Sequence, residues 1–450
     1  MANRPEPPGA AGRLLRHPLD REIARLALPA LGALAAEPLY ILADTAVVGH
    51  LLGTPQLGGL AVAGTLLTTA IWMFNFLAYG TTAAVARAWG AGQPDAAARH
   101  AAQALWLALG LGGVLTLAGL AGAEVAVDLM GASPEVRPEA LTYLRISALG
   151  APAILVGLVG VGYLRGLQDT TAPLRIALLA NLTNLVAEVA LIYGAGMGMA
   201  ASAATTVAAQ YGAAAIFARW IVRHGRAAGV SWRPDPAAQR QLVVVGRDLF
   251  VRTGSLLGAL ALATAVASRL GTAEVAAHQV AFQLWSFLAL VLDSLAIAGQ
   301  AMVGRLLGAG RAAEARVVSR RLLEWGVLTG VAFAAGVVLA RPLLPGLFTD
   351  DPRVAHLTAQ VLWLVAVLQP VNGAVFVLDG VLIGAGDLRF LARAMLGALI
   401  VFAPAAWAVG LLDLSLPALW GALALLMAVR LAAVAWRFAG SAWAVTGAGR

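Results

Sequence analysis

Residues 101–122 read AAQALWLALGLGGVLTLAGLAG, twenty-two residues without a charged side chain. Because an α-helix rises about 1.5 Å per residue, a helix of this length spans the roughly 30 Å hydrocarbon core of a bilayer. Similar stretches follow one another from about Leu26 to Trp436, separated by short breaks that hold arginine, glycine or proline. The chain therefore has lipid as its main solvent, and no room is left for a sizeable soluble domain.

The composition fits a chain that is surrounded by lipid. Of 450 residues, 60% are hydrophobic and 12% are charged, about half the charged fraction of a soluble domain. Cysteine is absent, which excludes disulfides, thiol catalysis and cysteine-bound metals. Abundant Arg, Ala and Gly without any lysine indicate a GC-rich bacterial genome. Residues 1–20 lack the apolar core and cleavage site of a signal peptide, so the first apolar helix is expected to act as the insertion signal.

Twelve membrane-spanning helices are predicted from the apolar stretches. They occupy residues 25–48, 57–86, 101–122, 140–164, 173–193, 198–220, 242–269, 275–303, 320–340, 356–382, 389–411 and 416–438. The connections after even-numbered helices hold most of the arginines, among them Arg87, Arg165, Arg223, Arg226, Arg305, Arg316 and Arg389, whereas the other connections hold acids such as Glu124 and Asp128. Cytoplasmic loops of membrane proteins carry an excess of arginine. We therefore expect a multi-pass protein of a bacterial plasma (inner) membrane, with both termini in the cytoplasm.

The two halves of the chain repeat each other at a constant shift of 218 residues, without a gap. The shift places matching residues on one another: Gly90-Ala91-Gly92 on Gly308-Ala309-Gly310, Arg87 on Arg305, Pro134 on Pro352, Pro152 on Pro370, Gly166 on Gly384 and Asp169 on Asp387. Because each copy holds an even number of helices, both copies share one orientation in the membrane. The predicted segments are a cytoplasmic tail (1–24), an N-lobe (25–222), a cytoplasmic linker (223–240), a C-lobe (241–438) and a C-terminal tail (439–450).

This organisation predicts an all-α polytopic membrane protein of the transporter class. Two six-helix bundles related by a pseudo-two-fold axis along the membrane normal form the scaffold of rocking secondary transporters. The sequence holds no GxxxxGK[ST] phosphate-binding motif, so an ion gradient rather than ATP is expected to supply the energy. A receptor, a scaffold or a membrane enzyme is the alternative, but no clustered metal ligands or Ser/His pair indicate an enzyme. No cofactor, metal or nucleic-acid partner is expected.

Ionisable residues inside a membrane span are expensive and mark function. Asp44 and Glu37 lie two turns apart on the first predicted helix, Asn184 and Glu188 share a face of the fifth, and Thr206 lies at a similar depth on the sixth. Carboxyl groups in such a low-dielectric place take up and release protons, and the same oxygens are hard ligands for sodium. We interpret these five residues as a candidate ion-coupling site. Alternatively, Asp44 only accepts hydrogen bonds that hold helices together.

A second set of polar residues falls in the second half of the chain. Candidates for lining a substrate cleft are Asp293, His278, Gln279, Gln283, Trp285, Gln300 and Asn372. Tryptophan faces attract flat organic cations, whereas amides also bond neighbouring helices, so both roles stay open. Asp379 lies near the end of its predicted helix and is interpreted as a cap or loop partner.

The sequence resembles the multidrug and toxic compound extrusion (MATE) transporters, and within them the DinF-like branch. The resemblance rests on Leu28-Pro29, on Ala43-Asp44-Thr45-Ala46-Val47-Val48-Gly49-His50, on Arg87 to Gly92, on Leu164-Arg165-Gly166-Leu167-Gln168-Asp169-Thr170, on Ala276-Ala277-His278-Gln279 and on Val303 to Gly310. It covers essentially the whole chain. The stretch from Asp44 to His50 and the Ala-Ala-His-Gln stretch are its more specific parts.

The resemblance implies two six-helix bundles that face a central cleft, and antiport of organic compounds against H⁺ or Na⁺. The family's acid on the first helix maps to Asp44, and its pattern on the fifth maps to Asn184 and Glu188, where the branch usually carries aspartate. The seventh predicted helix lacks the buried acid of some sodium-coupled branches, which favours protons. A lipid-linked precursor flippase of the same superfamily is the alternative, and it would need cationic residues in its cleft. The expected partners are a small organic substrate and membrane lipid, and a monomer is expected.

Overall fold

The computed structural model describes residues 18–448, and within this part of the chain all regular structure is helical. The helices of the first half are α2 (Pro18–Leu51), α3 (Thr54–Trp72), α4 (Phe76–Gly90), α5 (Pro94–Leu129), α6 (Arg137–Ala148), α7 (Ala151–Gly166), α8 (Thr171–Val189), a π-helical turn η1 (Ala190–Gly194) and α9 (Met199–Ala227). Those of the second half are α10 (Pro236–Leu270), α11 (Thr272–Gly308), α12 (Ala312–Ala340), a 3₁₀ turn η2 (Pro345–Leu347), α13 (Pro352–Gly384), α14 (Leu388–Leu411) and α15 (Leu416–Ala439).

These helices reproduce the predicted set of spans. Ten segments are long and apolar enough to cross a membrane on their own, and α6 with α7 makes an eleventh that is bent by 51°. The remaining predicted span, 198–220, corresponds to α9, which does not pass this test of composition because it holds Ser202, Thr205, Thr206 and Gln210 among many alanines. It packs against α7 and α8 all the same. The fold class, an all-α polytopic membrane protein, is confirmed.

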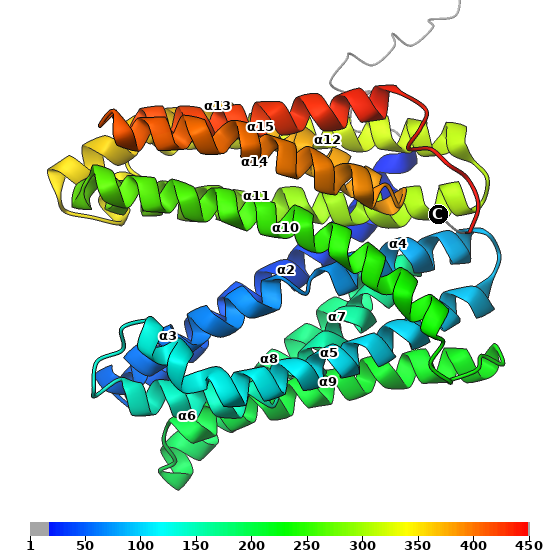
Figure 1. The fold of residues 1–450 in the computed structure, drawn as a ribbon, viewed down its shortest axis with the longest axis horizontal. Helices are drawn as coiled ribbons and strands as arrows, with labels where there is room; N and C mark the ends of the chain where they lie inside the picture. Colours follow the sequence, from blue (N-terminus) through cyan, green and yellow to red (C-terminus); the bar gives the residue numbers. More distant parts are fainter. Residues whose placement is uncertain (1–17, 449–450) are drawn as a thin grey trace, which may run out of the picture.

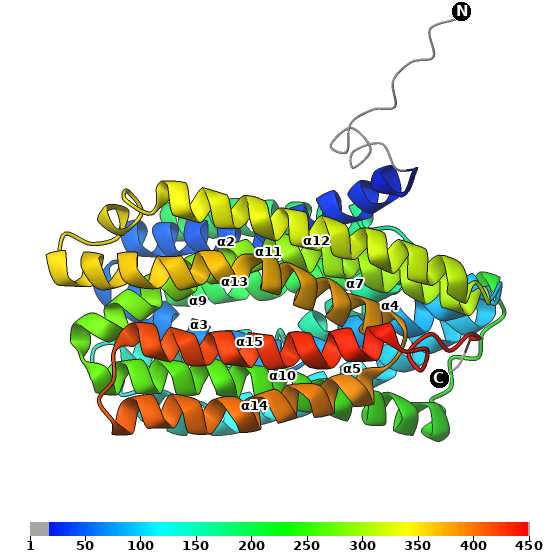
Figure 2. The same cartoon turned by 90° about the horizontal axis from the view of Figure 1, so that it is seen from above.

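The helices form two lobes, the N-lobe (α2–α9) and the C-lobe (α10–α15) (Figure 1). Within the C-lobe, α10, α14 and α15 lie side by side, and α12 with α13 lies opposite them (Figure 2). Each lobe has apolar clusters of its own, around Phe402 and Trp420 in the C-lobe and around Tyr163 and Phe217 in the N-lobe. The chain therefore builds two bundles rather than one continuous core.

The internal repeat reappears in the helix bounds and in the packing. A shift of 218 residues places the span Thr54–Gly90 on α11, and the end of α7 on the end of α13. A Cβ atom built on Gly162 would lie 2.5 Å from the carbonyl oxygen of Ala78, and one built on Gly380 would overlap that of Ala296. These two pairs are related by the same shift. Only glycine, which has no Cβ atom, fits at these two positions, because two helix backbones touch there once in each lobe.

The two lobes cross where α4 and α11 end. A Cβ atom on Gly90 would overlap the backbone of Arg305, and one on Gly308 would overlap the backbone of Arg87. We call this end of the molecule the crossing end. From there the lobes diverge towards the opposite end, the splayed end, which holds the loop after α5 and the loop after α12 (Figure 1).

The first helix of each lobe starts against the other lobe. The first turns of α2 pack on the C-lobe, where Asp20 pairs with Arg321 at 2.7 Å and Glu22 pairs with Arg305 at 2.6 Å. Its repeat copy α10 starts against the N-lobe, where a Cβ atom on Gly246 would lie 2.7 Å from the Phe76 ring. Both helices then run diagonally into their own lobes (Figure 1).

The helix bounds differ from the predicted segment bounds at two places. Helix α2 begins at Pro18 rather than at residue 25 because proline, Asp20 and the pairing with Arg321 favour a helix start there. Residues 1–17 of the predicted tail 1–24 lie outside the described residues. The linker is shorter than 223–240, since α9 continues to Ala227 and α10 begins at Pro236, capped by the Asp235 side chain. The tail after α15 is packed, with Trp443 fully buried.

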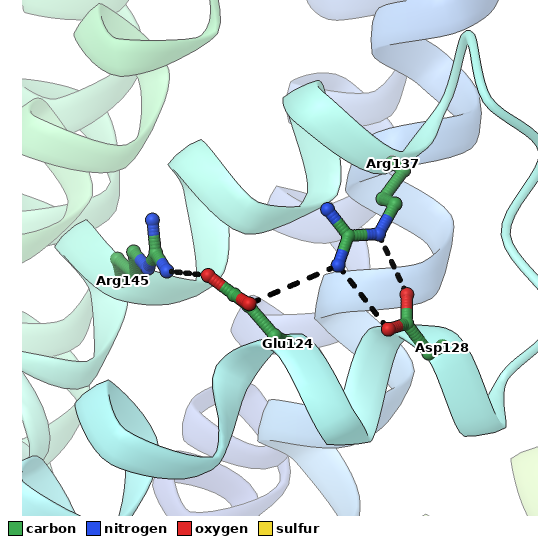
Figure 3. A network of polar contacts seen from close by, with 4 residues as sticks. All are labelled: Glu124, Asp128, Arg137 and Arg145. Carbon is green, nitrogen blue, oxygen red and sulfur yellow. Dashed lines mark hydrogen bonds and ion pairs between the residues drawn. The ribbon is translucent and has the colours of Figure 1, made fainter.

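A network of exposed ion pairs ties α5 to α6 at the splayed end (Figure 3). Arg137 donates to Asp128 at 2.6 Å and lies 4.0 Å from Glu124, which also accepts from Arg145 at 2.6 Å. Exposed pairs of this kind contribute about 0–1 kcal/mol each. The network therefore fixes the direction of the turn between α5 and α6 more than it stabilises the lobe.

Candidate functional site

The predicted ion-coupling residues come together inside the N-lobe. Helix α2 brings Asp44, α8 brings Asn184 and Glu188, and α9 brings Thr206. Asn184 donates to the Thr206 hydroxyl at 3.0 Å, and α8 packs between α2 and α9. Asp44, Asn184 and Glu188 are each at most 4% exposed. Four of the five predicted residues therefore form one cluster, which we call the carboxyl cluster.

Two residues of the carboxyl cluster were not identified from the sequence. The Tyr40 hydroxyl lies 3.2 Å from Thr206 Oγ1, accepts from Asn184 at 2.5 Å and donates to Asp44 Oδ1 at 3.4 Å. The Ser202 hydroxyl donates to the same Asp44 oxygen at 3.4 Å. The sequence spacing could have indicated both residues, since Tyr40 precedes Asp44 by one helical turn and Ser202 precedes Thr206 by one turn, so each pair shares a helix face.

The two acids of the cluster are neighbours. Asp44 and Glu188 are close enough to interact electrostatically, and Ser202 lies near both. Among the described residues, neither carboxylate oxygen of Glu188 has a hydrogen-bond donor, and Asn184 Oδ1 has none either. No arginine or histidine of residues 18–448 hydrogen-bonds to Asp44 or Glu188. Two neighbouring buried carboxylates disfavour ionisation of both, so the cluster favours a bound proton or cation.

Glu37 does not belong to this cluster. It is exposed on α2 and makes no hydrogen bond or ion pair with another residue of the described chain. Residue 37 also lies next to Pro38, inside the helix. The structure therefore leaves Glu37 as a separate acid on the same helix.

An apolar pocket adjoins the carboxyl cluster between α8 and α9. Its volume is about 280 Å³, and Asn184 forms part of its wall together with Thr183 and Thr205. The remaining lining consists of small and aliphatic side chains, such as Leu179, Ala209 and Ile216. A pocket of this size and lining suits a small apolar group, with one amide at its polar end.

The cleft candidates of the C-lobe separate into exposed and buried residues. Gln279, Gln283 and Phe287 form an exposed stripe at one-turn spacing along α11. His278, by contrast, is 1% exposed and packs against Phe282 and Trp420. Its predicted place at a cleft surface was wrong, because the opposite face of α11 carries it into the C-lobe core.

The other C-lobe candidates lie mostly inside the helix packing. Trp285 is partly buried beside Phe282, with ring centroids 5.8 Å apart. Gln300 and Asn372 are 1% and 2% exposed. The Gln300 backbone meets Gly384 closely enough that a Cβ there would lie 2.5 Å from the Gln300 carbonyl oxygen. Neither amide oxygen, Gln300 Oε1 or Asn372 Oδ1, has a hydrogen-bond donor among the described residues, so the interpretation that these amides bond neighbouring helices stays a prediction.

A buried group of charges lies where the lobes meet, and sequence analysis missed it. Asp379 accepts from Arg252 at 2.6 Å and from Arg430 at 2.8 Å. It is therefore no cap or loop partner but the anion of a buried triad. Asp293 from α11 is close enough to interact electrostatically with Asp379 and with Arg165 from α7. The contacts join residues 51 to 127 positions apart, which no local pattern reveals.

Two lobes of six membrane segments, with a buried pair of acids in one of them, define a multi-pass α-helical protein of the transporter type. No group of three or more His, Cys, Asp or Glu side chains suited to a metal ion occurs within residues 18–448. The family comparison is specific: the MatE family model matches residues 29–190 and 256–408, and the chain belongs to this family of transporters.

Relatives cover nearly the whole chain. The sequence is 32% identical to DNA damage-inducible protein F of Escherichia coli, over 93% of this chain and 92% of the relative. It is 33% identical to Protein DETOXIFICATION 44, chloroplastic, of Arabidopsis thaliana, over 93% and 82% of the two chains. Among solved structures, a multidrug resistance MATE family transporter of the MOP superfamily in an outward-facing conformation matches with a TM-score of 0.82. The two are 22% identical, over 96% of this chain and 99% of that one. That likeness concerns the fold.

Proposed function

We propose that this protein is a secondary active multidrug efflux antiporter, which exports lipophilic or cationic organic compounds in exchange for protons. The observation that carries the proposal is the pair of neighbouring acids Asp44 and Glu188, buried without a basic hydrogen-bond partner in the described chain. Such a pair holds a proton when no other cation is near. Loss of that proton leaves a negative site that a cationic compound can neutralise.

Exchange follows if the proton and the cargo compete for this site. A proton bound to Asp44 or Glu188 removes the charge that attracts a cationic compound, and so favours release. The pocket beside Asn184 accommodates an apolar part of the cargo. Because the two ligands exclude each other at one site, a proton gradient across the membrane drives the compound the opposite way.

The direction of export rests on the proposed orientation. We place the crossing end in the cytoplasm of a bacterial inner membrane, because Arg87 and Arg305 lie there and arginine favours the cytoplasmic side. Both termini then lie in the cytoplasm, and the splayed end opens outward. The cargo leaves from this outward-open form while protons enter it. A monomer in lipid suffices for the cycle, since both acids come from one lobe.

Sodium is the second choice of coupling ion. Asn184 Oδ1 and both Glu188 oxygens lack donors among the described residues, and oxygens of this kind suit a hard cation. The two ions are distinguished by loading purified protein into liposomes with a cationic dye and imposing either a pH gradient or a sodium gradient. Dye export driven by the pH gradient alone supports proton antiport.

The test of the site compares variants in the same liposomes. We expect Asp44→Asn and Glu188→Gln to abolish gradient-driven export while the protein stays folded. The matched control is Glu124→Gln, which removes an exposed acid of the ion network at the splayed end. Normal export by Asp44→Asn would contradict a coupling role, and would indicate that Asp44 only accepts hydrogen bonds that hold helices together.

A lipid-linked precursor flippase is the alternative function, and one observation favours it. Arg165, Arg252 and Arg430 at the lobe boundary are cations of the kind that hold a pyrophosphate. A flippase would move fluorescent lipid-linked sugar between leaflets and export no dye under either gradient.

A further inference from the structure

Exposed arginines without a protein partner gather at the end of α9. Arg219, Arg223 and Arg226 follow one another at spacings of four and three residues, so they share one face of the helix. All three are exposed, and none forms an ion pair or a hydrogen bond with a residue of the described chain. We call these three residues the arginine face. Other exposed arginines of the crossing end pair with acids, as Arg99 does with Asp95.

The connection that follows α9 is fixed against α5. The Gln103 side chain donates to the Arg233 carbonyl oxygen at 3.0 Å and accepts from the Asp235 backbone N–H at 3.0 Å. Trp106, one turn further along α5, donates to the Trp232 carbonyl oxygen at 2.9 Å. Because the connection is held in this way, the arginine face ends at a defined place beside the start of α5.

The charge of this region is strongly unbalanced. Residues 219–240 hold five arginines and one acid, Asp235, a difference of +4. The Asp235 carboxylate caps α10 and accepts from the backbone N–H groups of Ala237 and Ala238 at 2.9 and 3.4 Å, so it does not pair with an arginine. The anions that balance the arginine face therefore come from outside the described chain.

Orientation in the membrane does not require an arginine face at this place. The internal repeat sets Arg219 on Arg437, which donates to Asp387 at 2.6 Å. It sets the other two positions of the face on Ser441 and Ala444. The last helix of the C-lobe therefore ends at the same end of the molecule without a matching group of unpaired arginines.

The arginine face lies at the level where acyl chains give way to headgroups. Trp106 and Trp220 are 43% and 36% exposed beside it, and exposed tryptophans are typical of this level. Further into the membrane, α5 exposes Leu109 and Leu117. Helix α9 packs on helices of the N-lobe and runs along the edge of that lobe away from the C-lobe (Figure 1). Its exposed end therefore faces lipid rather than the space between the lobes.

We propose that the arginine face binds the phosphate group of an anionic phospholipid, whose acyl chains lie along α5 and α9. A guanidinium presents parallel N–H donors that match two oxygens of a phosphate. Phosphatidylglycerol is the simplest lipid of this class, because its phosphate carries a net charge that the ammonium group of phosphatidylcholine cancels. The site belongs to the leaflet at the crossing end. It depends neither on the coupling ion nor on the direction of transport.

The test measures which lipids lie next to α9. The chain has no cysteine, so Ala215→Cys, an exposed position one turn before Arg219, carries a single fluorophore. The protein is placed in phosphatidylcholine nanodiscs with a minor fraction of doxyl-labelled phosphatidylglycerol or doxyl-labelled phosphatidylcholine. The ratio of the two quenching efficiencies gives the preference for the anionic lipid. With its native arginines, the protein is expected to prefer phosphatidylglycerol about tenfold or more, since each arginine near a membrane surface contributes about fivefold.

Two triple variants separate the arginine face from general positive charge. The first replaces all three arginines of the face by glutamine and is expected to lose about tenfold in preference, with unchanged quenching by doxyl-labelled phosphatidylcholine. The second is the matched control Arg320→Gln, Arg389→Gln, Arg393→Gln, which removes exposed and unpaired arginines of the C-lobe at the same end and is expected to keep the preference. Equal losses in both variants, or no preference with the native arginines, overturn the proposal.

Competition distinguishes a lipid from a soluble anion. Inorganic phosphate is expected to leave the preference unchanged, compared with sodium chloride of the same ionic strength. A loss of preference with inorganic phosphate alone would indicate a site for soluble phosphate and overturn the proposal. Dye export under a gradient is a separate measurement, so a failure of the antiport proposal leaves the lipid preference as it is.

Discussion

The crossing of the lobes offers a direct test of how this protein changes conformation. Gly90 and Gly308 let the backbones of α4 and α11 touch. A Cβ atom on Gly90 would lie 2.9 Å from Arg305 Cα, and one on Gly308 would lie 2.8 Å from Arg87 Cα. Carbon atoms in contact prefer about 3.5–4.0 Å, so the double variant Gly90→Ala, Gly308→Ala must separate the lobes here by about 1 Å.

The cost falls only on conformations in which the lobes cross. Overpacking a well-packed contact costs about 1–3 kcal/mol. If the crossing end opens during transport, the open form does not bear this cost, and the equilibrium shifts towards it by about 5- to 150-fold. We therefore expect the double variant to populate a form that is closed at the splayed end.

The measurement exploits the absence of cysteine in the chain. Leu129 and Leu347 are 83% and 76% exposed at the splayed end, one in each lobe, and are related by the repeat. Cysteines introduced at these two positions can carry spin labels, and double electron–electron resonance then measures the distance between the labels on the two lobes. The double variant is expected to gain a population at shorter distance.

A matched control excludes a general effect of glycine replacement. Gly397 lies inside α14, and a Cβ there meets nothing within 4 Å. Gly397→Ala is expected to stabilise α14 by about 0.5–1 kcal/mol in both conformations, without moving the distance distribution. An unchanged distribution in the double variant, or the same change in Gly397→Ala, would refute the reasoning.

Three further predictions concern other parts of the molecule. Asp379→Asn leaves two arginines without their anion and is expected to destabilise the protein by about 3–5 kcal/mol. Thermal unfolding in detergent measures this loss. The control Asp95→Asn, in an exposed ion pair, should lower the stability by at most about 1 kcal/mol. Glu37→Gln should keep proton-driven dye export within about twofold of wild type, because Glu37 has no partner in the described chain; a loss as large as that of Asp44→Asn would place Glu37 in the coupling site. Deletion of residues 442–450 removes the Val445 and Gly447 carbonyl groups that accept hydrogen bonds from Arg87 at 2.8 and 2.9 Å. The deletion should shift the spin-label distances in the same direction as the glycine variants. An unchanged distance distribution would contradict a role of this tail in holding the lobes together.

The sequence predicted the membrane spans and the repeat because both depend on local composition and on a constant shift. It also predicted most of the carboxyl cluster, since Asn184 and Glu188 are one turn apart and acids are rare inside spans. Tyr40 was missed because a tyrosine in an apolar helix is common, and only the contact with Asn184 shows its role.

The charges at the lobe boundary were beyond reach of sequence reasoning. Asp379 meets Arg252 across 127 residues and Arg430 across 51 residues, and no local pattern in the sequence indicates either contact. His278 was misplaced because a conspicuous polar residue in an apolar helix attracts a functional interpretation. The helical phase that turns His278 inward, relative to Gln279 and Gln283, depends on how α11 packs.

The crossed start of α2 also bears on how the protein is made. Asp20 leaves the ribosome 301 residues before its partner Arg321. At a translation rate of about 5–20 residues per second, roughly 15 to 60 s pass between the synthesis of the first turns of α2 and that of Arg321 on α12, against which they pack. During synthesis, this amino-terminal segment therefore has to remain in the membrane unpaired or be held by an insertion factor, and the nascent N-lobe docks its first helix last.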